Sequence, residues 1–403
     1  MKLVDFNKID INSYDGYKKK IAKRLKELSL PSKKSEEYRY FNIEALLNRE
    51  YKSVDISLED REIRESSKVI IEDGVVVAIP KGVDILVGCS NVVDVDLDHF
   101  DPLYFLGHLF SREVISIRIK DNVDIEIEHR FTKSDSLISY RVAIYADSGI
   151  EAQIFESFKD IGKDFFVLSG YDLFISKGAK VKFIKNLPIE ENRYNLIFSN
   201  RIKVDKEGEY RYFGFDFGDG ESLELNKVEL HQKSRAFLNN LLFSKNSGVR
   251  GAIFKVIHID KESHTFQNLK AILKDNSRVI FDGLIKVENS ALYSVAHQNS
   301  KAILLNDGAY MISKPQLEIY IDELEASHGS TTGSLDEEQI FYLRARGINL
   351  QEAKKMLIVG FANEMIEEVD DSNLKEVIHA SFEKSYYGKH HLECLETCHG
   401  CEG

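Results

Sequence analysis

The chain has 403 residues, more than the roughly 250–300 that one hydrophobic core usually accommodates, so we expect a long core domain with smaller appendages. Hydrophobic residues make up 43% of the chain and charged residues 30%, which excludes a wholly disordered protein. The formal net charge of −12 argues against a protein that gains its affinity by neutralising nucleic-acid phosphates.

The sequence carries no signal for export or membrane insertion. Residues 1–14 lack an apolar core of signal-peptide length, and no run approaches the roughly 18 apolar residues of a membrane helix. Three of the four cysteines lie close to the C-terminus and only Cys89 lies elsewhere, so no disulfide framework is expected. These observations predict a cytoplasmic protein.

A helical region opens the chain, and we place it at residues 1–68. Apolar residues recur at helical spacing from Tyr17 to Leu28, and Pro31 is placed to end that helix. A second, short helix is predicted over residues 43–47.

Between residues 69 and 322 the pattern changes to short runs rich in Val, Ile, Phe and Tyr, such as 252–257 and 278–281, which are typical of strands. Turn signals in this region recur about 29 or 30 residues apart. This spacing is typical of a β-solenoid, in which each coil covers the apolar face of its neighbour and only the ends need caps. A β-sandwich with evenly spaced turns is an equal alternative on spacing alone.

The C-terminal region, residues 323–403, returns to a helical pattern. Ser334 with Glu337, and Asn349 with Glu352, have the spacing of capping boxes at the starts of two helices. Apolar residues at helical spacing from 353 to 365 predict the buried face of the second helix. That face comprises Ala353, Met356, Leu357, Gly360, Phe361 and Met365.

A third helix is predicted around residues 374–382. The first two helices and the short turn between them could suggest a DNA-binding helix-turn-helix. Residues 336–370, however, contain eight acidic and four basic side chains, so the charge opposes a phosphate-facing role. We therefore predict a helical module that docks on another protein.

The segment from residue 258 to residue 361 carries the sequence features of a known family. They are His258 with Gln267, Phe281-Asp-Gly283, Gln298-Asn299, Lys314-Pro-Gln-Leu-Glu-Ile319, Ala326-Ser-His-Gly-Ser330 and the run from Leu335 to Ile348. Near the N-terminus, Leu30-Pro31 followed by residues 36–40 adds a weaker match. Together they resemble the SufB/SufD family of iron–sulfur cluster assembly proteins, and Ser327-His328-Gly329 resembles its SufD-type members.

The resemblance implies a mainly β fold. A right-handed parallel β-helix, expected over residues 69–322, would be flanked by the N-terminal and C-terminal α-helical regions. This decides between solenoid and sandwich, which the residues alone leave open.

The resemblance also implies the function. The chain would be a non-catalytic scaffold subunit of a SufBCD-type complex for iron–sulfur cluster assembly and transfer, with no tightly bound cofactor and a transient cluster at a subunit interface. A SufB-like subunit would pair with it through the β-helix, and the C-terminal helices would bind the ABC-type ATPase SufC. No nucleic acid or membrane is expected as a partner. The candidate docking residues are Leu335, Ile340, Phe341, Leu343, Arg344, Arg346, Met356, Leu357 and Phe361.

His328 is the candidate cluster ligand that the resemblance implies at the interface with SufB, since imidazole can replace thiolate in cluster ligation. Family members often carry a cysteine just before Ser-His-Gly, where this chain has Ala326, so the thiolates would come from the partner. On the residues alone, a polar turn histidine is the favoured interpretation of His328. We interpret the other histidines of the β region as structural, and they are His231, His258, His264 and His297.

The C-terminal tail holds three soft ligands. Cys394, Cys398 and Cys401 have a spacing that can surround a four-iron cluster, which predicts transient binding of iron or a cluster. The alternative is a chain end that binds metal adventitiously.

Other functions remain open at this stage. The chain could form a homodimeric scaffold on SufC, or it could be a generic β-solenoid module that binds protein or carbohydrate. A solenoid enzyme of the pectate-lyase type is disfavoured because such enzymes are exported. The sequence contains no Walker-type phosphate loop, Gly-x-Ser-x-Gly or His-Glu-x-x-His motif, so we expect no enzymatic activity.

Overall fold

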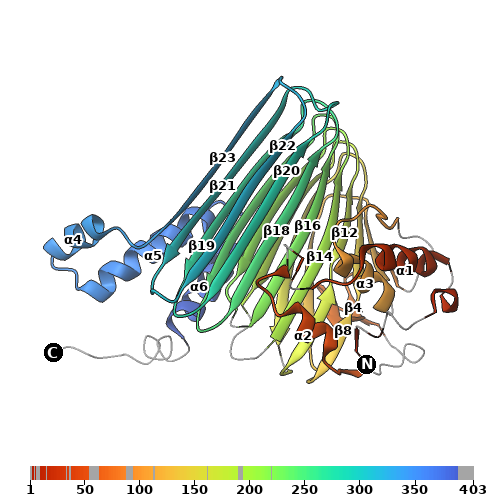
Figure 1. Cartoon of the computed structure of the whole chain (residues 1–403), viewed down its shortest axis with the longest axis horizontal. Helices are drawn as coiled ribbons and strands as arrows, with labels where there is room; N and C mark the ends of the chain where they lie inside the picture. Colours follow the sequence, from red (N-terminus) through yellow and green to blue (C-terminus); the bar gives the residue numbers. More distant parts are fainter. Residues whose placement is uncertain are drawn as a thin grey trace.

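The computed structural model describes most of the chain. The described residues are 2–3, 5, 10–14, 16–32, 34–35, 38–53, 63–87, 94–111, 114–160, 162–188, 194–218 and 220–388. They form a mainly β structure with short helical parts at both ends (Figure 1).

Two β-sheets face each other, and the chain passes from one to the other as it winds (Figure 1). From β7 onward the strands pair in parallel with the matching strands of neighbouring coils, so that Glu151 lies beside Lys180 and Lys180 beside Glu209, whereas β3 with β4 and β5 with β6 are antiparallel pairs. The spacing of the turn signals therefore corresponds to one coil. The prediction of a parallel β-helix is confirmed, and the sandwich is excluded.

The first sheet contains β5 (Asp84–Val87), β6 (Val114–Ile119), β9 (Arg141–Ala146), β12 (Tyr171–Ile175), β14 (Tyr194–Val204), β16 (Glu221–Leu230), β18 (Val249–His258), β20 (Arg278–Val287) and β22 (Tyr310–Ile319). A branch of the same sheet runs from β14 through β11 (Phe165–Ser169) and β8 (Ser136–Ser139) to β1 (Lys52–Ser53). The second sheet contains β2 (Arg64–Glu65), β4 (Val75–Ile79), β3 (Val69–Glu72), β7 (Val123–Phe131), β10 (Glu151–Asp160), β13 (Lys180–Leu187), β15 (Glu209–Asp216), β17 (Arg235–Ser244), β19 (His264–Leu273), β21 (Ser294–Leu304) and β23 (Leu324–Gly333).

The inner faces of both sheets form one continuous apolar core. Because side chains alternate across a strand, every second residue points inward and stacks on its counterpart in the next coil. Val228, Val256 and Ile285 stack in this way and are fully buried. Burying each such side chain contributes about 1.5–3 kcal/mol, so the coils stabilise one another through this core.

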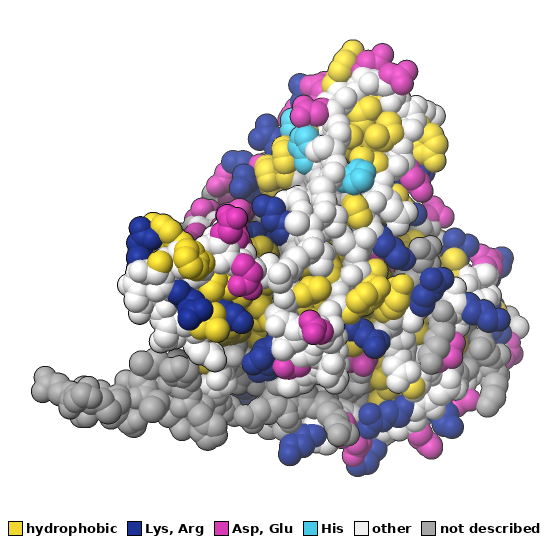
Figure 2. All heavy atoms as spheres, turned by 60° about the vertical axis from the view of Figure 1, so that its left-hand side comes forward, with side chains coloured by type: hydrophobic (Ala, Val, Ile, Leu, Met, Phe, Trp, Pro, Cys, Tyr) yellow, Lys and Arg dark blue, Asp and Glu magenta, His cyan; other side chains and the backbone are white. Residues whose placement is uncertain are grey.

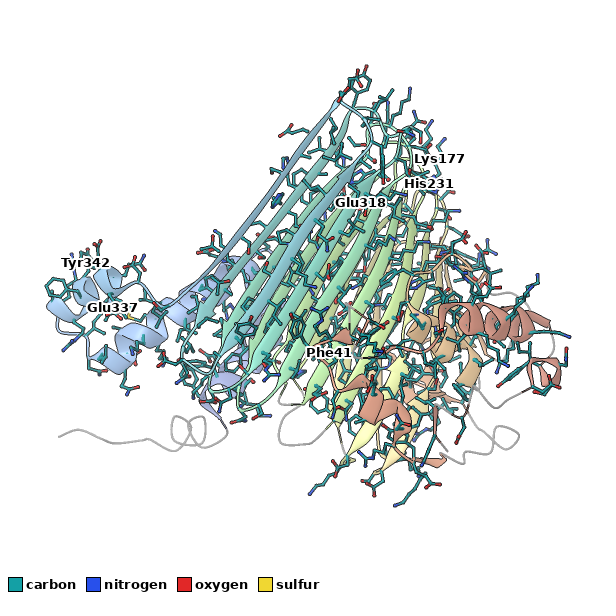
Figure 3. All side chains as sticks on the ribbon, viewed as in Figure 1. Phe41, Lys177, His231, Glu318, Glu337 and Tyr342 are labelled. Atoms are coloured by element: carbon teal, nitrogen blue, oxygen red, sulfur yellow. The ribbon has the colours of Figure 1, made fainter. Side chains whose placement is uncertain are left out.

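The turns between the sheets also stack. Lys177, His231 and Glu318 are far apart in the sequence and lie at the same end of the strands (Figure 3). At this end the Gly149 N–H donates to the Lys177 carbonyl of the next coil at 3.0 Å. The turns therefore continue the hydrogen bonding of the strands.

His258 is buried where β18 enters a turn. Its Nδ1 lies 2.7 Å from Ser263 Oγ and its Nε2 lies 2.9 Å from Thr265 Oγ1, so both ring nitrogens have hydroxyl partners. Burial lowers the pKa of His258 to about 4, because a charged ring would lose its hydration there.

The N-terminal helices cover the outer face of the first sheet. They are α1 (Gly16–Leu28) and α2 (Ile43–Asn48), which agree with the predicted positions, and α3 (Pro102–Phe110), which was not predicted; a single turn, η2 (Ile11–Ser13), precedes them. Phe41 packs onto Gly251 of β18, where a Cβ would come within 2.3 Å of Phe41 Cζ (Figure 3).

A buried ionic cluster holds α3 on the solenoid. Asp172 of β12 lies 2.8 Å from Arg141 Nη2 and 3.1 Å from His108 Nε2, and it accepts a hydrogen bond of 2.6 Å from Tyr104 Oη. All four side chains are buried. Although burial alone would raise the pKa of Asp172, its cationic and hydrogen-bonding partners outweigh that effect and hold the pKa well below its usual range.

Three helices follow β23: α4 (Glu337–Ala345), α5 (Leu350–Ile366) and α6 (Ser372–Tyr387). α5 and α6 pack on the outer face of the second sheet, where Phe217 and Phe243 contact Phe382 of α6. α4 projects beyond the stack of strands (Figure 1).

Two details of the C-terminal helices differ from the predictions. The N-cap of α4 is Asp336, which accepts from two backbone N–H groups, rather than Ser334; Asn349 caps α5 as predicted. The buried face of α5 includes Ile358 and Ala362, whereas Met356 is 46% exposed. The predicted face was offset because the apolar residues surround most of this helix and only the sheet selects one side.

β23 lies beyond residue 322, where we expected the solenoid to end. It pairs in parallel with β21 along its whole length, so the stacked sheets extend to Gly333. No helix within the described ranges combines the length and the apolar character needed to cross a membrane.

We predict that His258 makes the stability of the protein depend on pH. In the unfolded chain the ring should titrate near about 6.5, whereas its folded pKa is about 4. As the pH falls below about 6.5 the unfolded state takes up the proton first, so up to about 3 kcal/mol of stability is lost by about pH 4.

The thermal midpoint measured between pH 7 and pH 5 checks this. His258→Gln should lower the midpoint at pH 7 and should flatten its fall toward pH 5 relative to the wild type. An unchanged slope would contradict the assignment.

Candidate assembly site at the open end of the solenoid

The last coil of the solenoid has no neighbour on one side. β22 pairs only with β20, and β23 pairs only with β21, within the part of the chain that the structure describes. Most of β23 is exposed, whereas β19 and β21 are buried between their neighbours. Both sheets therefore present free backbone donors and acceptors at the same end of the molecule.

His328 lies on the inner face of β23. Leu324 and Ala326 of this strand pack against the solenoid core, and Ser330 Oγ lies 2.9 Å from Ser313 Oγ of β22, so alternate residues from 324 to 330 point inward. Strand alternation places His328 in this set. It is exposed because no further coil covers it. The imidazole therefore belongs to the open mouth of the solenoid and is not in a turn.

Polar side chains lead from the interior to this mouth. Gln298 of β21 is in register with His328, and Gln267 of β19 is in register with Gln298. The Gln298 Nε2 donates to Gln267 Oε1 at 2.7 Å, and both side chains are nearly fully buried. Beside them, three serine hydroxyls contact one another at Oγ–Oγ distances of 2.7 to 3.1 Å. They belong to Ser300, Ser313 and Ser330.

The outer face of the same end is mixed in character. His297 lies there, with its Nδ1 2.7 Å from Ser327 Oγ and its Nε2 3.2 Å from Glu325 Oε1. On the other sheet, Tyr320 directly follows β22 and is 55% exposed. Figure 2 shows histidine side chains among hydrophobic ones on the upper half of the molecule at this end. Such a surface combines apolar area with polar groups, as protein interfaces do.

A second exposed apolar surface lies on α4. Phe341 is 75% exposed and Tyr342 is 55% exposed, and the guanidinium carbon of Arg346 lies 3.5 Å from the centroid of the Tyr342 ring. Figure 3 shows Glu337 and Tyr342 on the part of α4 that is remote from the strands. Tyr342 was not among the predicted docking residues, although it directly follows Phe341 in the sequence.

The structure divides the predicted docking residues into two groups. Phe341, Arg344, Arg346 and Met356 are exposed, and Leu343 and Leu357 are half-buried. Ile340 is buried at 3% exposure, and Leu335 and Phe361 pack against the core cluster between the second sheet and α5. Leu335 and Phe361 thus help to attach the helices to the solenoid, and the Lys270 ammonium of β19 also donates a hydrogen bond to the Phe361 carbonyl at 3.0 Å.

The predicted tail site of Cys394, Cys398 and Cys401 lies outside the described residues, as does Cys89. Among the residues that the structure does describe, no group of three or more His, Cys, Asp and Glu side chains is arranged to hold a metal ion. Iron–sulfur clusters are usually held by four protein ligands. The single imidazole of His328 at the open end could supply only one of them, so any others would come from outside the described residues or from another chain.

Comparison with known proteins agrees with this architecture. The family model for the SUF system FeS cluster assembly SufBD core domain matches residues 129–361, which comprise the solenoid from the end of β7 onward, α4 and most of α5. The iron–sulfur cluster assembly protein SufD of Escherichia coli is 26% identical over 379 residues, covering 88% of this chain and 89% of that protein.

Two further relatives align over shorter stretches. The protein of the same name from Bacillus subtilis is 26% identical over 167 residues, 41% of this chain and 38% of that protein. The one from Plasmodium berghei is 32% identical over 213 residues, 51% of this chain and 15% of that much longer protein. The chain therefore belongs to the SufB/SufD family, and within it is most similar to the proteins named SufD.

Proposed function

We propose that this chain is a SufD-like scaffold subunit that assembles and transfers iron–sulfur clusters in the cytoplasm, together with a SufB-like subunit and a SufC-type ATPase, and that it catalyses no reaction itself. The observation that carries the proposal is the open last coil. There, two strands that each have one unpaired edge, and an inward-facing imidazole, lie at one end of the described solenoid.

The free strand edges favour a β-rich partner. An unpaired edge of ten residues in each sheet is a template for another chain, and proteins normally cover or disrupt such edges. A second solenoid of similar width could continue both sheets at once through main-chain hydrogen bonds. A SufB-like subunit meets this requirement if its fold is similar.

His328 would contribute one ligand to a cluster held between the two subunits. Ala326, its inward-facing neighbour on β23, offers no thiolate. The partner would therefore supply the sulfur ligands. Mixed and shared ligation suits a scaffold, because a cluster that binds weakly can be handed on.

α4 is the candidate docking element for the ATPase. Phe341 and Tyr342 are exposed aromatic side chains, the type of residue that most often anchors an interface. Arg346 stacks on Tyr342 and adds a positive charge beside them. Because α4 projects away from β22 and β23, the ATPase and the SufB-like subunit could bind at the same time (Figure 1).

A homodimer is the second candidate. The same open coil could pair with a copy of itself, since identical edges can meet about a two-fold axis. Such a dimer would bring two His328 imidazoles together without any cysteine from the described residues. Size-exclusion chromatography of the chain, alone and co-expressed with its SufB-like and SufC-type partners, distinguishes the candidates: a heteromeric complex is expected, and a dimer that ignores both partners would refute the leading proposal.

We expect the exposed aromatic residues of α4 to be needed for binding of the ATPase. Phe341→Glu should weaken binding of the SufC-type ATPase by about tenfold or more, because it removes an aromatic anchor and introduces a charge into an apolar contact. Calorimetry with the purified ATPase measures the affinity. Val377→Glu, a matched change at a 46% exposed position of α6, should leave the affinity unchanged. Equal affinities for both variants would exclude α4 as the docking element.

The second prediction concerns His328. His328→Ala should lower the iron and sulfide retained by the purified complex after anaerobic reconstitution by about tenfold or more, because one ligand is lost. His231→Ala, in a turn distant from the site, serves as the control. Retention equal to that of the wild type would show that the imidazole is not a ligand.

A further inference from the structure

A row of inward-facing polar side chains on neighbouring strands ends at His328. Gln267 of β19, Gln298 of β21 and His328 of β23 occupy the same position in three neighbouring strands of the second sheet. Gln267 is 3% exposed and Gln298 is 2% exposed, whereas His328 lies at the open mouth. The exposed imidazole of His328 is thus the last side chain in a row of polar residues whose other two members are buried.

The Gln298 amide is held from two sides. Its Nε2 donates to Gln267 Oε1 at 2.7 Å. From the opposite sheet, Gly283 of β20 lies against the same nitrogen, and a Cβ at this position would come within 2.1 Å of it. Gly283 therefore leaves the space that the amide fills, and any other residue would displace it.

The Gln298 Oε1 is buried without a hydrogen-bond partner among the described residues. Leaving such an acceptor unpaired costs about 1–3 kcal/mol, so its retention needs a reason. In a planar amide the nitrogen and the oxygen lie on opposite sides of the Cγ–Cδ bond. Because Nε2 is turned toward Gln267 of β19, Oε1 is turned away from that residue, and β23, which carries His328, is the strand on the other side of β21.

We propose that Gln298 is a positioning residue for His328: its Oε1 accepts a hydrogen bond from one ring N–H, so that the other ring nitrogen presents its lone pair away from the solenoid. The inference rests on the proposed function, in which His328 is a ligand. Neighbouring strands are about 4.8 Å apart, which is within reach of two long side chains. A ligating histidine commonly donates its other N–H to a fixed acceptor, which selects the tautomer.

Residues from separate parts of the sequence meet at the Gln298 amide. Gln267, the glycine of Phe281-Asp-Gly283 and Gln298 lie in three different strands, and they meet around one amide group. Each residue contributes differently to this arrangement. Gly283 makes room, Gln267 fixes the orientation of the amide, and Gln298 carries the acceptor.

The tautomer of His328 is the direct test. In the full chain labelled with ¹⁵N-histidine, ring-nitrogen shifts recorded at about pH 8.5, where free imidazole is neutral, report the ratio of the two tautomers. The His328 signals are assigned by their loss in His328→Ala. One tautomer should dominate in the wild type. Gln298→Leu and Gln298→Met, which remove the acceptor, should shift the ratio by about fivefold, the equivalent of one hydrogen bond of ~1 kcal/mol.

Two variants serve as controls. Gln298→Glu keeps an oxygen acceptor and should keep the dominant tautomer, and Gln351→Leu, at an exposed position of α5, should not alter the ratio. The inference is overturned if either folded acceptor-free variant stays within about twofold of the wild-type ratio, less than one hydrogen bond would produce, or if Gln298→Glu shifts as far as they do. Cluster retention in His328→Ala tests the ligand role separately, so the two claims can fail independently.

Discussion

Backbone hydrogen bonding between coils is the constraint on which the rest of this structure depends. Each strand from β7 to β21 has hydrogen-bonded strand neighbours in the coil before it and in the coil after it. Because the register repeats from coil to coil, a buried residue such as Val256 stacks on an apolar residue in each neighbouring coil. It also means that the last coil cannot be satisfied from within the described chain, since β22 and β23 each have one strand neighbour.

The outer apolar face of each sheet is covered by a different set of helices. The N-terminal helices cover the first sheet through an apolar cluster and through Tyr104 and His108 of α3, which contact the buried Asp172. The helices α5 and α6 cover the second sheet. Neither set of helices covers the open end of the solenoid, and α4 projects away from it. The arrangement therefore separates two surfaces, one of β-edges around His328 and one of aromatic side chains on α4, that different partners could use.

The sequence indicated the coils more clearly than it indicated the site. Turn signals at a constant spacing predicted a repeat, but they could not distinguish a solenoid from a sandwich, because both place turns evenly. The family resemblance was needed for that. α3 was missed although Asp101 and Pro102 form a helix start, since the surrounding residues are as apolar as those of a strand.

Side-chain burial was the harder problem. Ile340 and Phe361 were predicted to contact a partner; in this chain Ile340 is buried, and Phe361 is half-buried against the cluster between α5 and the second sheet. Periodicity alone cannot tell which apolar side of a helix meets its own protein. Gln298 was noted only as part of a motif. Its relation to His328 depends on the register between β21 and β23, and register between coils is a property of the assembled sheets and not of any local pattern.

Hydrogen–deuterium exchange across residues 310–333 tests the central claim, that the open coil is the surface completed by a β-rich partner, most directly. In the isolated chain, the amides of β22 and β23 that point away from β20 and β21 should exchange rapidly, since they have no partner strand. In complex with the SufB-like subunit the same amides should slow by at least about tenfold, equal to ~1.4 kcal/mol of added protection. Unchanged exchange in a complex that has formed would contradict the account, because the partner would then bind elsewhere.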